Sequence, residues 1–240
     1  MDISPEDKGE NIRREICFTL EQMGIQPEAS HHEEGPGQNE IDFHYSDALS
    51  AADNASTFKW IVRTRAANAG LYADFSPKPI KDKAGSGFHI NLSCSDKDQK
   101  QKVLAGILKH AEELTYYMNC KEESYDRLGS NKAPSFIAWG YENRSTFIRI
   151  PATTNSDASR IEIRSPDCEC NVYLVFTLLI YAALDGIKNN LLPEADVKEN
   201  LFEFSEEMIK QKQLKRLPDT LDSAKAIAEK SSFIKEALGF

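Results

Sequence analysis

Three charged side chains share one face of a predicted strand in the segment SRIEIRSPD. Successive side chains on a strand point to opposite faces, so Arg160, Glu162 and Arg164 line up on one face. Ile161 and Ile163 take the other face. One interpretation is a solvated edge strand. The other is a site in which the carboxylate holds a cation and the two guanidinium groups hold anions.

A second predicted strand, over FHINLS (88–93), repeats the two-faced pattern. His89, Asn91 and Ser93 share its polar face, and a glycine-bracketed turn that begins at Gly85 precedes it. Glycine lets a ligand approach the backbone closely, although such a turn is more often only a turn. A second strand with a polar face favours a functional site over a solvated edge strand.

The loop HHEEGPGQNE places Glu33 and Glu40 on either side of a Gly–Pro–Gly turn. Such a turn can fold both carboxylates onto a common point. Mg²⁺ and Mn²⁺ prefer oxygen ligands, and Mn²⁺ also accepts imidazole. Glu34 competes for the same role, and acidic loops are usually just solvated. From this motif alone, metal binding and a solvated loop both stay open.

Arginines gather near predicted strands and loop ends. Planar guanidinium groups suit carboxylates and phosphates through forked hydrogen bonds. Phosphoryl transfer depends largely on positioning and on neutralising charge with metals and cations. This group of arginines therefore suits a phosphoryl-transfer site. The sequence carries no Walker loop and no dinucleotide-binding fingerprint. The arginines are Arg127, Arg144, Arg149, Arg160 and Arg164.

The net charge, the length of the most apolar run and the distribution of cysteines argue against some classes of protein. The net charge of -9 over 240 residues, without a dense basic stripe, argues against nucleic-acid binding. The most apolar run, 172–184, is shorter than the about 20 residues that a membrane span needs, so no membrane partner is expected. The polar N-terminus lacks a secretory signal, and the scattered cysteines suit a reducing compartment. The cytoplasm is the expected location.

Helices and strands that must position these residues alternate irregularly along the chain. Short gaps suit antiparallel neighbours, so the predicted class is α+β, and without a linker the simplest count is one domain over 1–240. The predicted strands cover 41–45, 88–93, 136–139, 146–150 and 159–164. The predicted helices cover a first segment capped at Ser4 and ending at Gly24, then 54–69, 98–118, 172–190 and much of the last fifty residues.

Taken together, several blocks of the sequence resemble the catalytic domain of glutamine synthetase. They are ASHHEEGPGQNEIDF, SPKPIKDKAGSGFHINLS, NRSTFIRIPA and RIEIRSPD, followed by a tail that starts at KENLFEFSEE. They occur in the family's order and span nearly all of the chain. The resemblance implies a curved, mainly antiparallel sheet with helices packed on its outer side. It also implies ATP-dependent ligation of ammonium to glutamate through a γ-glutamyl phosphate, two or more Mg²⁺ or Mn²⁺ ions, and homo-oligomeric rings.

The resemblance further implies a role for each matching residue. The ligands of one divalent ion would be Glu33 and Glu40, and those of the second would be His89 and Glu162. The glutamate-binding positions would be Gly85, Arg127 and Arg164. The nucleotide-binding positions would be Glu28, Asn91, Ser93, Arg144, Arg149 and Arg160. The catalytic residues would be Arg127 and Arg144.

The sequence departs from the family pattern at several positions. Lys132 stands where the family commonly has a glutamate that attracts ammonium, and Asp157 stands where a nucleotide-contacting lysine is frequent. Phe202 replaces the tyrosine that some members use for adenylylation, so that regulation should be absent. By the family pattern, we also expect this chain to be without the acidic E-x-E strand, the small N-terminal domain and the last helix. We therefore expect a catalytic-domain fragment that has no activity alone.

Two alternative functions stay open. Lys132 favours a divergent ligase of the same superfamily that joins glutamate to another amine. The missing metal carboxylates favour a non-catalytic metal- or nucleotide-binding protein reduced from such an enzyme.

Overall fold

The computed structural model describes residues 6–130, 132–153 and 160–240, so the predicted cap at Ser4 and the departure at Asp157 lie outside the described residues.

The chain divides into two compact units. Unit 1 comprises Met1–Phe75 and Asp82–Ala84, and unit 2 comprises Ser76–Lys81 and Gly85–Phe240. The expectation of a single domain over 1–240 stays a prediction, because compactness does not by itself say whether the units fold separately.

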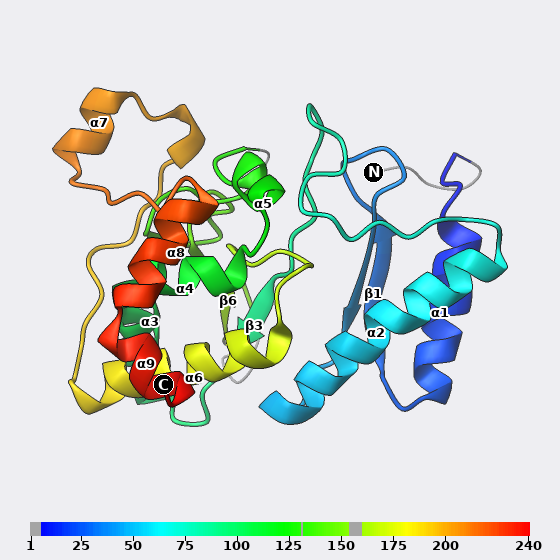
Figure 1. The fold of residues 1–240 in the computed structure, drawn as a ribbon, viewed down its shortest axis with the longest axis horizontal. Coiled ribbons are helices and arrows are strands. Elements are labelled where there is room, and N and C mark those ends of the chain that lie inside the picture. The colour runs from blue at the N-terminus through cyan, green and yellow to red at the C-terminus, as the bar shows by residue number, and fades with distance from the viewer. Residues whose placement is uncertain (1–5, 131, 154–159) are drawn as a thin grey trace. The chain divides into compact units, whose positions relative to one another are not determined.

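Unit 1 combines a hairpin with two helices (Figure 1). Its elements are α1 (Glu10–Gln22), β1 (Pro27–His32), β2 (Asn39–Phe43) and α2 (Ala48–Asn68). The apolar stripe of α1 is buried at Ile16 and Leu20, which pack in one cluster with Ile61 of α2. Met23 follows the last residue of α1 and is 49% exposed.

The first strand of the hairpin lies where the sequence predicts a loop. β1 pairs antiparallel with β2, and His31 lies directly opposite Glu40. β1 shows no regular alternation of buried and exposed residues, so periodicity could not reveal it. Its strand conformation comes from pairing with β2.

The sheet of unit 2 has four strands in the order β3-β6-β5-β4. Their bounds are β3 (Ile90–Leu92), β4 (Trp139–Tyr141), β5 (Ile148–Ile150) and β6 (Ile161–Ile163). β6 is antiparallel to both of its neighbours, and only β4 and β5 are parallel. The α+β class and the mainly antiparallel sheet are therefore confirmed.

Helices make up most of the rest of unit 2. They include α3 (Lys100–Lys109), α4 (Ala111–Met118), α5 (Glu122–Arg127), α6 (Val172–Lys188), α7 (Glu206–Gln211), α8 (Leu221–Lys230) and α9 (Ser232–Leu238). The single helix predicted over 98–118 is wrong, since the chain turns at His110 between α3 and α4. The His110 ring nitrogens lie 2.5 Å from Glu113 Oε2 and 3.1 Å from Asp185 Oδ2 of α6.

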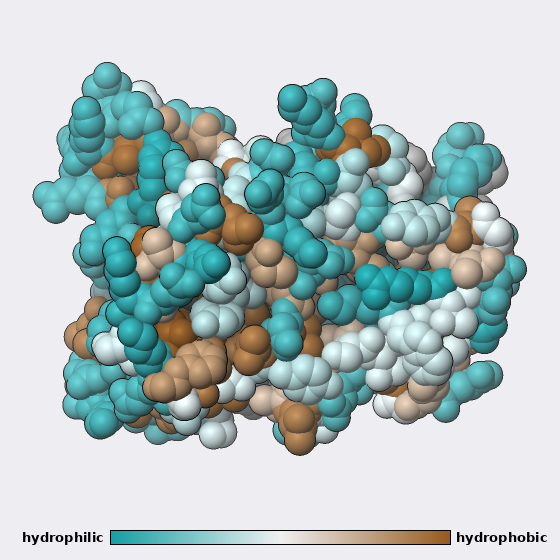
Figure 2. Space-filling view, in the orientation of Figure 1, coloured by the Kyte–Doolittle hydropathy of each residue, from teal (hydrophilic) through white to brown (hydrophobic). Residues whose placement is uncertain are grey.

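One face of α6 is buried in unit 2 while another carries exposed apolar side chains. Among the described residues, no helix combines the length and apolarity needed to cross a membrane. Figure 2 shows hydrophobic atoms at the surface in the region of α6 and α9. The exposed apolar residues of α6 are Tyr173, Leu174, Ile180, Tyr181 and Leu184.

Candidate functional site

The sheet register of unit 2 places three polar residues in one row. Asn91 of β3 and Arg149 of β5 are both paired with Glu162 of β6. Paired residues share a face of the sheet, so the polar face predicted for the two strands is continuous with β5. On the opposite face, Ile90 and Ile148 flank Ile163, and all three are buried.

Glu162 sits at the centre of a cluster of cations. It is only 6% exposed. Its Oε1 lies 3.1 Å from Arg164 Nη1 and 3.3 Å from His89 Nδ1. Its Oε2 lies 2.8 Å from Arg149 Nη1, as an ion pair without hydrogen-bond alignment. Two guanidinium groups around one carboxylate leave an excess of positive charge, which suits an anionic ligand.

Backbone carbonyls fix two buried arginines beside this row. Arg164 donates from Nε to the carbonyl of Arg144 at 3.2 Å and from Nη2 to that of Lys132 at 3.1 Å. Arg127 donates from Nη1 to the carbonyl of Ser165 at 2.7 Å and from Nη2 to that of Arg164 at 3.2 Å. Burial lowers the pKa of both groups, but guanidinium stays protonated in proteins.

His89 is suited to the neutral state in which imidazole binds metal. Its pKa is lowered well below the usual value, first by loss of hydration and then by the positive charges of Arg164 and Arg127. A neutral ring can offer a nitrogen lone pair, and Glu162 lies beside it. The pair therefore fits a divalent ion that accepts nitrogen and oxygen ligands.

The glycine-bracketed turn lies against arginine. A Cβ at Gly85 would come within 2.8 Å of Arg127 Cγ and 2.6 Å of the carbonyl oxygen of Pro77. A Cβ at Gly87 would come within 2.9 Å of both Arg127 Nη2 and His89 Nε2. The group that approaches these glycines closely in the structure is the Arg127 side chain, and the expected approach of a ligand to this turn stays a prediction.

The remaining predicted residues of unit 2 take different positions. Asn91 Oδ1 accepts a hydrogen bond from Arg160 Nε at 3.0 Å. Ser93 is exposed just beyond the end of β3. The Arg144 side chain is exposed, and its carbonyl is the group that holds Arg164.

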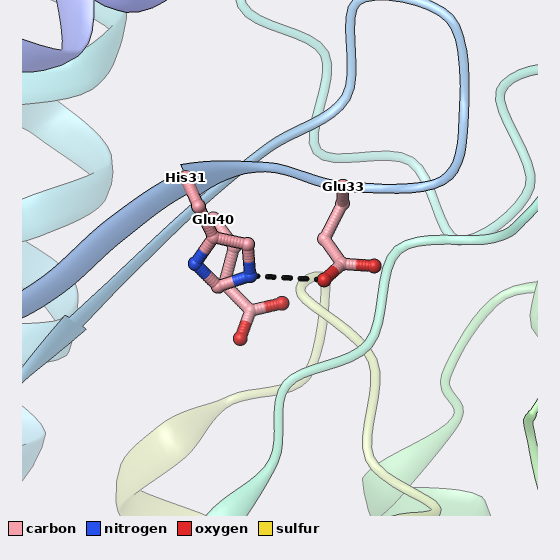
Figure 3. Close-up of side chains that lie close together, drawn as sticks. All are labelled: His31, Glu33 and Glu40. Carbon is pink, nitrogen blue, oxygen red and sulfur yellow. Dashed lines mark hydrogen bonds and ion pairs between the residues drawn. The ribbon is translucent and has the colours of Figure 1, made fainter. Parts of the chain in front are cut away.

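A second cluster lies in unit 1, at the end of the hairpin (Figure 3). His31, Glu33 and Glu40 each offer one ligand atom, and these atoms all lie within 4.8 Å of one another. His31 Nε2 is 2.9 Å from Glu33 Oε1. The Glu33 amide donates to the Gln38 carbonyl at 2.9 Å, which closes the turn. The turn thus brings Glu33 and Glu40 together as its sequence predicts, whereas their role as metal ligands stays a prediction.

The charge state of this cluster fits a cation. The pKa of Glu40 is raised to about 7, first by burial and then by the negative charges of Asp42 and Glu33. A divalent ion among these groups would offset that repulsion, and carboxylate oxygens with one imidazole suit Mn²⁺. His31 was missed as a candidate because its position opposite Glu40 depends on the unpredicted strand β1. Glu34 and Glu28 are exposed.

Comparison with known proteins matches the whole chain to one family. A family model described as the catalytic domain of glutamine synthetase matches residues 1–240. The glutamine synthetase of Clostridium saccharobutylicum is 42% identical over 254 residues, which cover 99% of this chain and 57% of the relative. That of Pyrococcus furiosus is 43% identical over 251 residues, with the same two coverages. The chain spans a little over half the length of these relatives.

Solved structures show the same fold. A complex of GmaS with ADP has a TM-score of 0.85 at 28% identity and covers 97% of this chain and 58% of its own. A cryo-EM structure of Plasmodium falciparum glutamine synthetase has a TM-score of 0.85 at 25% identity, covering 98% of this chain and 56% of its own. The fold predicted from the resemblance is confirmed, and this chain belongs to the glutamine synthetase catalytic-domain family.

Proposed function

We propose that this chain supplies the catalytic domain of a ligase that joins ammonium to glutamate at the expense of ATP. The glutamate side-chain carboxylate attacks the γ-phosphorus of ATP, and ADP leaves. Ammonia then displaces phosphate from the γ-glutamyl phosphate and forms glutamine. The family match over 1–240 supports the reaction type.

The arrangement around Glu162 is the observation that carries the proposal. Phosphoryl transfer requires little more of a protein than positioning and neutralisation of charge. Arg149 and Arg164 both contact Glu162, and Arg127 lies against the backbone of Arg164. In this proposal Arg127 and Arg164 bind glutamate, with Gly85 close beside Arg127. Arg144, Arg149 and Arg160 face the nucleotide phosphates, with Asn91, Ser93 and Glu28 as further nucleotide contacts.

The two clusters described above would hold the divalent ions. His89 and Glu162 offer one imidazole and one carboxylate, and Glu33 and Glu40, with His31 beside them, offer the other set. Mg²⁺ or Mn²⁺ bound there would neutralise phosphate charge and orient the nucleotide. The chain's own contribution is to hold each ligand atom in place through the hairpin turn and the sheet register.

The test is release of phosphate by the native protein isolated from its own cells. We expect turnover that requires ATP, glutamate, ammonium and Mg²⁺ or Mn²⁺ together, and its loss in a Glu162→Gln variant. The matched control is Glu206→Ala, which removes an exposed carboxylate paired with Arg216 on the surface. Release that proceeds without glutamate, or that survives Glu162→Gln, contradicts the proposal. The 240-residue chain alone is still predicted to be inactive.

Lys132 favours a second candidate, ligation of glutamate to an amine other than ammonium. The Lys132 carbonyl accepts from Arg164 Nη2 at 3.1 Å, which fixes this residue beside the site. By resemblance its side chain replaces an acidic group that attracts ammonium, and a cation there would repel ammonium. The same assay, run with ammonium and with primary alkylamines of increasing size, decides between the two. Turnover with ammonium alone removes the second candidate.

We also propose a homo-oligomeric assembly for the complete protein. The exposed apolar residues of α6 support it, because contiguous apolar surface marks protein–protein contacts. Light scattering of the native protein checks it, and a monomeric mass contradicts it. Location in the cytoplasm stays a prediction.

A further inference from the structure

Three cysteines surround one turn at the end of strand β6. The turn is closed by the amide of Cys170, which donates to the carbonyl of Asp167 at 3.4 Å, and by the amide of Glu169, which donates to Asp167 Oδ1 at 2.8 Å. Cys168 and Cys170 flank Glu169, and the Cys120 thiol donates to the Glu169 carbonyl at 3.3 Å. None of them is in a disulfide.

The turn is tied to the backbone that lies against the anion site. The Cys168 thiol donates to the carbonyl of Gly87 at 3.3 Å, and Gly87 forms an antiparallel bridge with Asp167. A Cβ at Gly87 would lie 2.9 Å from both Arg127 Nη2 and His89 Nε2. The Gly87 backbone is therefore close to His89, which contacts Glu162, and to Arg127, which contacts the backbone of Arg164.

The two thiols within the turn differ in accessibility. Cys168 is partly exposed, whereas Cys170 is only 2% exposed. Arg127 Nη2 lies against Gly87, and the Gly87 carbonyl accepts a hydrogen bond from the Cys168 thiol, so a guanidinium group is close to this thiol. An accessible thiol near a cation is the kind that oxidants attack first.

We propose that Cys168 and Cys170 form a reversible dithiol–disulfide pair whose oxidation loosens the Gly87 segment. Residues separated by one position in a tight turn keep their Cα atoms within the about 7 Å that a disulfide requires. A disulfide draws the Cys168 sulfur toward Cys170, so its bond to the Gly87 carbonyl is lost. The resulting weakening of glutamate binding rests on the proposed function, whereas formation of the disulfide does not.

The reaction balances with hydrogen peroxide as the oxidant. The Cys168 thiolate attacks one peroxide oxygen, the O–O bond breaks, and the product is a sulfenic acid with hydroxide as the leaving group. The Cys170 thiol then attacks the sulfenic sulfur. An S–S bond forms and, once the Cys170 proton is transferred, water leaves. Two thiols are oxidised and one peroxide is reduced to two waters. Small thiols reverse the change by exchange.

Cys120 is the competing partner, and its surroundings disfavour it. Burial raises the pKa of its thiol, and the negative charge of Asp167 raises it further. The thiolate is the reactive form, so Cys120 is a poor nucleophile. It also comes from a separate segment and is engaged with the Glu169 carbonyl.

Peptide mapping of the whole chain after peroxide treatment tests the pairing. Cleavage after Arg164 and Lys188 releases one peptide that holds both Cys168 and Cys170, whereas Cys120 falls in the peptide that ends at Lys121. We expect the first peptide to lose the mass of two hydrogen atoms and to regain it with dithiothreitol. A cross-link between the two peptides, or irreversible oxidation of Cys168 alone, overturns the proposal.

Variants and hydrogen exchange test the coupling. Cys168→Ser and Cys170→Ser should each abolish the reversible mass loss, while Cys17→Ser, a half-buried cysteine of α1, should leave it unchanged. The Phe88 amide donates to the Pro166 carbonyl at 2.8 Å. We expect its exchange to speed up in the oxidised wild type and to recover on reduction. Complete disulfide formation with unchanged exchange overturns the coupling. Neither the mass loss nor the hydrogen exchange requires substrate. A negative result in these two experiments is therefore distinct from a failure of the ligase proposal.

Discussion

At the scale of single residues, Glu162 links cations that would otherwise repel one another. Arg164 is 3% exposed and depends on Glu162 for its charge partner. Removing one member of a buried ion pair costs about 3 kcal/mol, because it leaves an uncompensated charge. We expect Glu162→Ala to lower the free energy of unfolding by that amount in urea titrations. Glu162→Gln keeps a carbonyl acceptor and should cost less.

The control for Glu162→Ala is Glu206→Ala, whose partner Arg216 is at the surface. An exposed ion pair contributes less than about 1 kcal/mol. Equal losses in the two variants would mean that the charges around Glu162 are solvated.

The hairpin cluster makes a separate prediction about metal. We expect the chain to bind Mn²⁺, and Glu33→Gln to weaken that affinity by at least about tenfold, since its carboxylate faces His31 and Glu40. Glu34→Gln is the matched control, because it removes the neighbouring exposed carboxylate. Electron paramagnetic resonance of free Mn²⁺ gives the affinity. If both substitutions weakened Mn²⁺ affinity equally, the ion would be attracted by the general negative charge of the loop and not bound by the cluster.

The contacts that could be predicted from the sequence are those set by local geometry. The sequence predicts that Glu33 and Glu40 lie close together, because the turn between them is formed by consecutive residues. The row across β3, β5 and β6 was only half predicted, because pairing of Arg149 with Glu162 depends on strands distant in sequence. His31 was missed for the same reason.

At the scale of elements, two glycines decide how closely α3 and α6 approach. A Cβ at Gly106 would lie 2.1 Å from the carbonyl oxygen of Ala182, and one at Gly186 would lie 2.0 Å from that of Lys102. Alanine is a better helix former by about 1 kcal/mol, but overpacking here should outweigh it. We expect Gly106→Ala to lower the free energy of unfolding by about 3 kcal/mol.

Denaturant titration measures that loss. The control is Glu112→Ala on the exposed side of α4, whose free energy of unfolding should lie within about 0.5 kcal/mol of wild type. A neutral Gly106→Ala would show that the two helices can separate without cost. These glycines carried no signal in the sequence, because only the packed structure shows what each one faces.

The start of α1 depends on a buried carboxylate. A hydrogen bond from Arg13 lowers the pKa of Asp7 below its ordinary value of 3.8, with help from the Gly9 amide. A carboxyl group with a lowered folded-state pKa stabilises the protein above its unfolded pKa, and that contribution is lost as the pH falls through the folded value. We expect Asp7→Asn to be destabilising at neutral pH.

The difference between wild type and Asp7→Asn should therefore shrink between about pH 5 and pH 2. Urea titrations at several pH values measure it. Glu10→Gln, which removes the partner of the exposed Arg14, should show little dependence of this kind. A difference that stays constant over the acid range would mean that the pKa of Asp7 is not lowered.

At the scale of the whole molecule, the division into two units predicts two unfolding steps. Unit 1 has its own apolar cluster around Leu20, and unit 2 has others, including one around Phe136 and Leu201. A smaller unit buries a smaller fraction of its surface and is less stable, so unit 1 should unfold first. This division could not be predicted from the sequence, because no change in composition marks a linker between the two units.

The two tryptophans make the prediction measurable, since Trp60 belongs to unit 1 and Trp139 to unit 2. Trp139 is 7% exposed, so its fluorescence in a Trp60→Phe variant reports unfolding of unit 2. Pulsed hydrogen exchange of peptides from α2 reports unit 1 in the same samples. We expect α2 to lose protection at a lower urea concentration than the Trp139 transition. Coincident midpoints would make the chain one cooperative domain, and the hairpin cluster would then share the stability of the sheet around Glu162.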